Sequence, residues 1–174
     1  MKVEVVEYNK KWQILFQEEA QKIKSILGNE LIDIYHIGST AVENLKAKPI
    51  IDIMPIVRDI TKVDDYNNEF ENLGYESKGE YGIVGRRYFR KGLKIRTHHI
   101  HIFEISNFKD IERHLAVRDF LRTHPQDAFE YGELKSKLAI AYPSDIEAYC
   151  DGKDGFVKEL ERKALKWYRL TKKL

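Results

Sequence analysis

Residues 31–57 read LIDIYHIGSTAVENLKAKPIIDIMPIV, and this run carries the strongest structural signal in the chain. Two parts of it, residues 31–37 and 49–57, are rich in isoleucine and valine and have the length of β-strands. The second part is apolar almost throughout, which is typical of a central strand, and Asp52 interrupts it. A turn of small residues begins at Gly38. We therefore expect two neighbouring strands joined by a turn whose backbone N–H groups are available to a ligand.

The rest of the chain adds helices and a hairpin to this pair of strands. Apolar residues at steps of three and four indicate helices, and β-branched and aromatic residues on both sides of Gly92 indicate a hairpin. The expected elements are helices at 9–27, 41–46 and 60–73, strands at 75–79, 87–91 and 94–105, and helices at 108–123, 125–141 and 144–170. This order predicts an α+β fold, a mixed β-sheet with flanking helices and a helical C-terminal half.

Composition favours one globular domain over residues 1–174. The hydrophobic fraction of 43% and the charged fraction of 33% are ordinary for a folded protein, and the net charge is only +2. Nucleic-acid binding by the whole surface is therefore not expected. The single cysteine, Cys150, forms no internal disulfide, and the chain has no signal peptide or long apolar run. These features predict a cytoplasmic protein without a membrane segment.

The turn and the aspartate together have the chemistry of a phosphate site. Glycine lets a backbone approach a phosphate closely, and Ser39 and Thr40 add hydroxyl groups beside Gly38. Asp52, at the end of a neighbouring strand, could hold a divalent cation against those phosphates. A plain turn beside a hydrogen-bonded strand aspartate explains the same residues equally well.

Six segments change this balance: HIGSTAV at 36–42, KPIIDIM at 48–54, GEYGIVGRRYF at 79–89, RTHHIH at 96–101, RDFLRTHP at 118–125 and residues 149–156. Through them nearly the whole chain resembles the GrpB family, whose members are assigned to the nucleotidyltransferase fold, and some relatives in that family look joined to dephospho-coenzyme A kinase. The resemblance implies a nucleotidyltransferase-like domain and a nucleotide-like small-molecule ligand.

The sequence departs from the wider nucleotidyltransferase pattern at one position. That pattern places a second carboxylate two residues after the first, where this chain has Met54. A thioether does not replace an oxygen ligand of magnesium, so other ligands are needed beside Asp52. His99 and His101 share one face of a strand, and imidazole favours metals such as manganese or zinc over magnesium. We expect Asp52, His99 and His101 as metal ligands, with His98 on the opposite face.

Further candidates are charged side chains outside this cluster. Glu80 or Glu104 could add an oxygen to the metal. Arg86 and Arg87 are expected to balance charge that develops during catalysis, and Arg96 and Lys153 to bind phosphate. An ordinary solvated hairpin and an exposed lysine are the alternative explanations for these basic residues.

Three functions are compatible with the sequence. The leading hypothesis is a metal-dependent nucleotidyl- or phosphoryl-transferase, with Asp52 as the central residue. The alternative is a non-catalytic module that binds a nucleotide or a coenzyme A-like ligand and has lost the second metal carboxylate. A third hypothesis is metal-dependent hydrolysis at the histidines.

Overall fold

The structure, a computed structural model, describes residues 2–172 of the chain. The chain divides into two compact units. The sheet unit comprises Lys11–Ile37 and Ile50–Ile111, and the helical unit comprises Met1–Lys10, Gly38–Pro49 and Glu112–Leu174. The single domain expected from the sequence stays a prediction.

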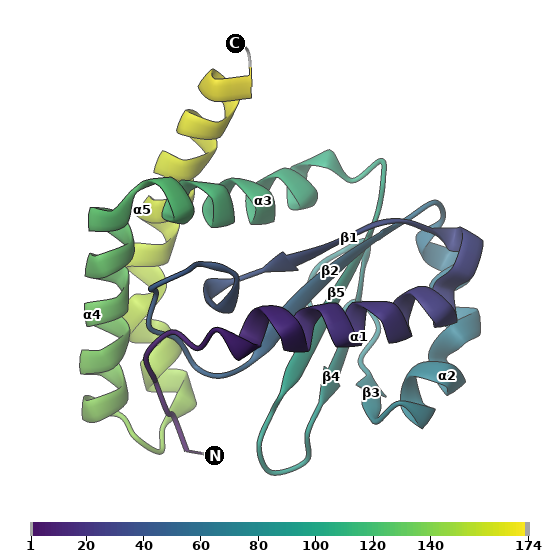
Figure 1. Ribbon diagram of the computed structural model, residues 1–174, viewed down its shortest axis with the longest axis horizontal. Helices are drawn as coiled ribbons and strands as arrows, with labels where there is room; N and C mark the ends of the chain where they lie inside the picture. The colour runs from purple at the N-terminus through teal and green to yellow at the C-terminus, as the bar shows by residue number, and fades with distance from the viewer. Residues whose placement is uncertain (1, 173–174) are drawn as a thin grey trace. The chain divides into compact units, whose positions relative to one another are not determined.

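The sheet unit contains a five-stranded mixed sheet, which confirms the predicted architecture (Figure 1). Its strand order is β1-β2-β5-β4-β3. β2 pairs with β1 antiparallel and with β5 parallel, whereas β4 pairs antiparallel with both β5 and β3. The strands are β1 (Leu31–Ile37), β2 (Ile51–Val57), β3 (Tyr75–Ser77), β4 (Arg86–Lys91) and β5 (His98–Glu104).

β2 occupies an interior position because nearly all its side chains are apolar and buried. Pro55 is unusual there, since proline has no N–H to donate to a sheet. The register between β2 and β5 accordingly pairs residues up to Ile53 and resumes at Ile56. Pro55 thus lies where the backbone pairing between β2 and β5 is interrupted.

Helix α1 (Lys11–Leu27) packs against β1 and β2, as its apolar periodicity predicts (Figure 1). Trp12 and Ile23 of α1 are buried, and the Phe16 ring stacks on His36 of β1 with 4.8 Å between ring centroids. A short 3-10 turn, Gly28–Glu30, leads from α1 into β1. Register places His36 beside Ile53, so α1 covers the sheet face opposite to that of Asp52.

The predicted helix at 60–73 is two elements. A 3-10 helix, Ile60–Tyr66, comes first, and the Asp59 carboxylate caps it by accepting a hydrogen bond from the Thr61 N–H. Helix α2 (Asn67–Asn72) follows, and its Phe70 ring packs 4.4 Å from that of Phe89.

A buried ionic group joins α1 to the far strands of the sheet. Glu19 of α1 is only 4% exposed, and its carboxylate accepts hydrogen bonds from Lys91 Nζ at 2.7 Å and from the Tyr75 hydroxyl at 2.9 Å. His98 Nε2 lies 3.9 Å from the same carboxylate. Burial alone raises the pKa of Glu19, but the hydrogen bonds from Lys91 and Tyr75 outweigh it and lower the pKa.

The β4–β5 hairpin has a longer loop than the sequence predicts. β5 begins at His98, not at residue 94. Gly92 adopts a φ of 106°, and its carbonyl accepts a hydrogen bond from Arg96 Nη1. A side chain at Gly92 would collide with the Ile95 backbone, which explains why glycine is required there.

The helical unit is built on α3 (Phe108–Thr123, from residue 112 onward), α4 (Pro125–Ala141) and α5 (Ile146–Lys172) (Figure 1). α5 begins two residues later than predicted, and Asp145 caps it by accepting a hydrogen bond from the Ala148 N–H. The core of this unit contains Val42, Leu45, Ala116, Phe120, Leu121, Ala128, Tyr131, Leu160, Ala164 and Tyr168.

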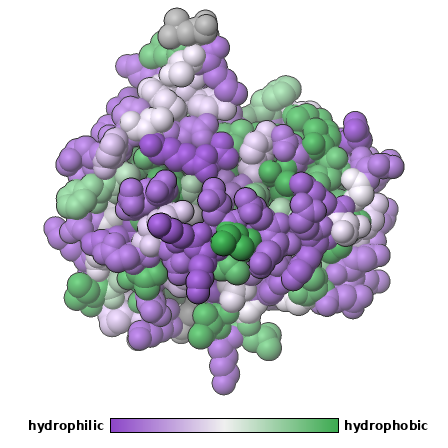
Figure 2. Space-filling view, viewed as in Figure 1, coloured by the Kyte–Doolittle hydropathy of each residue, from purple (hydrophilic) through white to green (hydrophobic). Residues whose placement is uncertain are grey.

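The predicted helix at 41–46 is absent from this part of the chain. A single 3-10 turn, Ser39–Ala41, takes its place, and an isolated bridge between Val6 and Ala47 follows. Hydrophilic residues predominate on the face shown in Figure 2, where apolar residues occur in small groups. Among residues 2–172, no helix combines the length and apolar character needed to cross a bilayer.

Candidate functional site

Asp52 lies near the start of β2, which has a neighbouring strand on each side. Its register partners are Ile37 of β1 and His99 of β5. Its side chain is 26% exposed, so the carboxylate is not enclosed in the apolar interior. Met54 shares this face of β2 and is fully buried. The position of the expected second carboxylate is therefore filled by an apolar group that packs in the core.

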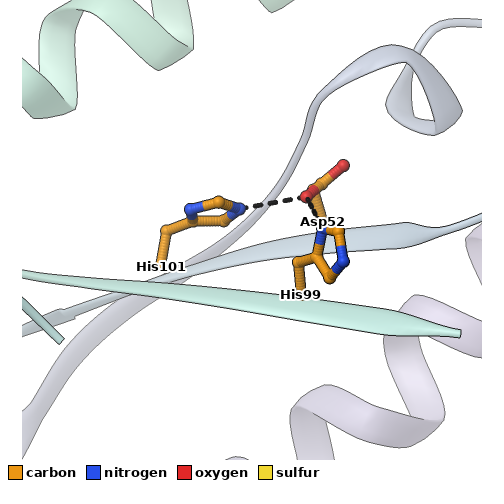
Figure 3. Close-up of side chains that lie close together, drawn as sticks. All are labelled: Asp52, His99 and His101. Atoms are coloured by element: carbon orange, nitrogen blue, oxygen red, sulfur yellow. Dashed lines mark hydrogen bonds and ion pairs between the residues drawn. The ribbon is translucent and has the colours of Figure 1, made fainter. Parts of the chain in front are cut away.

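Two histidines of β5 converge on the Asp52 carboxylate (Figure 3). His101 Nε2 lies 3.0 Å from Asp52 Oδ1, and His99 Nδ1 lies 3.5 Å from the same oxygen. One potential ligand atom from each residue lies within 4.8 Å of the other two. His98 points to the opposite face, toward Glu19, as strand alternation predicts. The structure therefore brings the three predicted ligands together.

Arg86 of β4 contacts the ring of His101. The guanidinium only donates hydrogen bonds, and Arg86 Nη1 lies 3.3 Å from His101 Nδ1. Arg86 also donates to the carbonyls of Glu80 at 3.2 Å and Tyr81 at 2.8 Å. Arg86 thus links His101 to the loop that precedes β4.

The electrostatics of the cluster favour an ionised carboxylate. Burial alone raises the pKa of Asp52, but hydrogen bonds from His101 and His99 and their positive potential lower the pKa far below its usual range. Burial and the charge of Asp52 raise the pKa of the neighbouring Tyr88 to about 12. Asp52 therefore carries a full negative charge, as a metal ligand requires.

The other residues predicted beside the metal have different partners. Glu80 Oε2 accepts from the Gly85 N–H at 2.6 Å, and Glu104 accepts from the Ile60 N–H and the Ser106 hydroxyl. Neither belongs to the group of potential ligands around Asp52. The expectation that one of them adds an oxygen is therefore not met, because backbone and hydroxyl donors already occupy these carboxylates.

Arg87 and Arg96 lie away from the Asp52 face. The Arg87 guanidinium forms two hydrogen bonds with the Asp64 carboxylate, at 2.7 and 3.3 Å. Register pairs Arg87 with Ile102, which puts it on the opposite face from His101. Arg96 belongs to the hairpin loop, where it donates to the Gly92 carbonyl. Adjacent positions in a strand point to opposite faces, so Arg86 and Arg87 do not share one ligand.

The predicted phosphate turn lies in the helical unit. Gly38 has a φ of 74°, the left-handed region that glycine tolerates, and begins the single turn Ser39–Ala41. The Ser39 hydroxyl accepts a hydrogen bond from Lys135 Nζ at 2.8 Å. Thr40 is 3% exposed. Ile37, the residue before Gly38, is the register partner of Asp52, but a common cleft for the turn and Asp52 stays a prediction.

Lys135 is a residue that the sequence did not single out. It lies on α4, is 2% exposed and has its ammonium 4.3 Å from the centre of the Tyr131 ring. Burial lowers the pKa of Lys135 well below its ordinary value, and the charges of Lys153 and Lys48 lower it further. A lysine in the middle of an amphipathic helix carries no sequence signal that distinguishes it from a solvated one.

A separate groove of about 450 Å³ lies between helices of the helical unit. Its lining combines aromatic side chains, including Phe120, His124 and Trp167, with the basic residues Arg162 and Lys166. None of the predicted site residues lines this groove. A search for concave surface alone would therefore not find the predicted site residues.

The mixed sheet, its flanking helices and the helical C-terminal half define a nucleotidyltransferase-like α+β fold. The Cid1 poly(U) polymerase has this fold, with a TM-score of 0.52 and 12% identity over 76% of this chain and 43% of that chain. More specifically, the chain belongs to the GrpB family, since the family described as "GrpB protein" matches residues 2–163. At 12% identity, the likeness to Cid1 concerns the fold alone.

Relatives within the family are much more similar. The crystal structure of the conserved protein GrpB from Enterococcus faecalis has a TM-score of 0.93 and 51% identity, covering 95% of this chain and 99% of that chain. UPF0157 protein YqkA of Bacillus subtilis (strain 168) is 48% identical over 95% of this chain. The chain spans only 48% of YqkA, about half its length.

A more distant relative carries the name of a kinase. The dephospho-CoA kinase of Mycobacterium leprae (strain TN) is 21% identical to this chain, covering 84% of the chain and 42% of the kinase. This similarity agrees with the expected relation between the family and proteins that carry such a kinase.

Proposed function

We propose that this chain is a metal-dependent nucleotidyl- or phosphoryl-transferase that acts on a nucleotide-like substrate. The observation that carries the proposal is the convergence of Asp52, His99 and His101 on one face of a nucleotidyltransferase-like sheet. No other group of three potential metal ligands occurs among residues 2–172. Cid1 has been solved with MgGTP bound, so a nucleotide is the first substrate class to test.

The donor set decides which metal suits the site. One carboxylate and two imidazoles fit a transition metal such as manganese or zinc, and they fit magnesium poorly. When bound, such an ion supplies Lewis acidity and neutralises charge on a phosphate oxygen. Asp52 contributes its fixed negative charge, and His99 and His101 contribute one ring nitrogen each.

The surrounding residues position this cluster. Arg86 fixes the ring of His101 through Nδ1 and holds the backbone of residues 80–81. We therefore assign Arg86 a positioning role in place of the expected contact with developing charge, and we leave Arg87 out of the site. Gly38, Ser39 and Thr40 are proposed to bind phosphate, with Lys153 as a further cation and Arg96 without an assigned role.

The alternative function is a binding module without catalysis. The observation in its favour is the full burial of Met54 where the wider fold has a second carboxylate. Such a module would bind a nucleotide or a coenzyme A-like ligand and release it unchanged. The cytoplasmic location expected from the sequence stays a prediction for either function.

The test combines metal analysis with a transfer assay. Elemental analysis and manganese or zinc titrations compare the wild type with Asp52→Asn and His101→Gln, and Asp65→Asn serves as a control for an exposed carboxylate. The four common nucleoside triphosphates are then assayed with the preferred metal for release of pyrophosphate or phosphate. We expect metal binding and turnover to be lost in the first two variants and kept in the control.

Two results would contradict the proposal. The first is an Asp52→Asn variant that folds normally and keeps full metal binding and turnover. The second is a wild-type protein that binds neither manganese nor zinc. Tight nucleotide binding with metal but no product would instead select the binding module.

A further inference from the structure

The helical unit concentrates positive charge around two hydroxyl groups. Lys135 of α4 is 2% exposed and donates to the Ser39 hydroxyl at 2.8 Å. Lys48 and Lys153 lie close enough for their charges to act on Lys135, and their Nζ atoms are 5.3 and 5.5 Å from the centre of the Tyr149 ring. We refer to Lys48, Lys135 and Lys153 as the three-lysine cluster.

Tyr149 adds a second, independent observation at this place. Its side chain is fully buried, and its hydroxyl has no hydrogen-bond partner among residues 2–172. A buried hydroxyl without a partner is rare, because leaving it unsatisfied costs free energy. Tyr149 lies on α5 one turn before Lys153, so its side chain and that of Lys153 share a helix face.

Two of the three lysines, Lys135 and Lys153, have no carboxylate partner in the part of the chain that the structure describes. Within residues 2–172, neither Lys135 nor Lys153 forms an ion pair with an aspartate or a glutamate, although the neighbouring Lys158 and Lys163 each do. Like charges in a buried place repel one another, and burial makes the ionised lysine still less favourable. An anion that contacts the lysines would remove both penalties and could accept a hydrogen bond from Tyr149.

We propose that the three-lysine cluster, with the hydroxyls of Ser39 and Tyr149, binds the phosphate chain of a di- or triphosphate. Lys135 acts beside Ser39 while Lys48 and Lys153 act beside Tyr149, so one ligand must reach two places. A chain of linked phosphates meets this requirement better than a single phosphate. The inference deepens the proposed function, on which it rests for the class of ligand, but it requires no metal.

Calorimetric titration with sodium tripolyphosphate tests the site directly. The titration is performed on the whole chain in the presence of a chelator, and orthophosphate is titrated in parallel. We expect tripolyphosphate to bind at least about tenfold more tightly than orthophosphate. Lys135→Met and Lys153→Met should each weaken tripolyphosphate binding by about tenfold, since each removes a charged hydrogen-bond donor. Lys158→Met, on the same helix as Lys153, is the matched control and should bind like the wild type.

Tyr149→Phe keeps the inference testable if a lysine variant fails to fold. It removes only the unpartnered hydroxyl, so the fold should be retained while tripolyphosphate binding weakens. Unchanged binding in all three variants, or no binding by the wild type, would overturn the inference. Asp52→Asn should bind tripolyphosphate like the wild type, because the inferred anion site needs no metal. A wild-type protein that binds tripolyphosphate but shows neither metal binding nor turnover would contradict the proposed transferase function and leave the anion site standing.

Discussion

Replacing Arg86 by methionine should destabilise the protein strongly. Arg86 is 6% exposed and donates hydrogen bonds to two backbone carbonyls and to His101. Hydrogen bonds from a charged group contribute about 1.5–3 kcal/mol each, and part of this is offset when the guanidinium no longer has to be buried. We therefore expect the free energy of unfolding to fall by roughly 3 kcal/mol, because the Tyr81 carbonyl loses the guanidinium donor and the Glu80 carbonyl keeps only its bond from the Ile83 N–H. For a chain of this size, that change lowers the melting temperature by about 6–12 °C.

Arg87→Met is the matched control for this experiment. Arg87 is the next residue of β4, but its partner Asp64 is 51% exposed at the side chain. An ion pair in such a position contributes about 0–1 kcal/mol, so the melting temperature should fall by no more than roughly 4 °C. Thermal unfolding followed by circular dichroism gives both values under identical conditions. Equal losses in the two variants would refute the reasoning, and so would an Arg86→Met variant that melts within a degree of the wild type.

Three further predictions concern stability. Glu19→Gln should cost about 3 kcal/mol at neutral pH, because it leaves the half-buried Lys91 without its counterion. The pKa of Glu19 is lowered in the folded state, so this contribution is lost as pH falls through that pKa, and denaturant titrations should show a smaller difference from the wild type at pH 3 than at pH 7. Gly155→Ala should raise the melting temperature by about 2–4 °C, since its site in α5 is open, whereas Gly152→Ala should gain none of this because a methyl group would lie 2.5 Å from Leu138 Cδ2. Lys135→Met should stabilise the protein at neutral pH: the lowered pKa of Lys135 means that the unfolded chain binds more protons, so wild-type stability rises as pH approaches 10 and the variant should lose this rise in thermal scans.

Much of the fold could be predicted because it depends on patterns within single segments. The apolar periodicity of α1 and the apolar run of β2 follow directly from the sequence, and both were located within about two residues. The strand order could not be predicted in this way, since the parallel pairing of β2 with β5 joins segments far apart in the chain. The helix expected at 41–46 failed because that stretch packs as irregular backbone around Val42 and Leu45.

The candidate site, like the fold, could be predicted only in part from the sequence. Strand alternation placed His99 and His101 on one face, and the structure adds that this is the face of Asp52. Alternation also separates Arg86 from Arg87, but deciding which one faces His101 requires the register of β4 with β5. Lys135 had no local signal at all, because its contact with Ser39 joins residues almost a hundred positions apart.

The arrangement of the sheet has a consequence for how the metal ligands come together during folding. β1 with β2, and β4 with β5, are antiparallel pairs of strands that are close in sequence, whereas the parallel contact of β2 with β5 closes a much longer stretch of chain. Asp52 stands on one side of that seam and the two histidines stand on the other. An ion bound by all three residues would therefore cross-link β2 and β5, the neighbouring strands of the sheet that are separated by the longest stretch of chain.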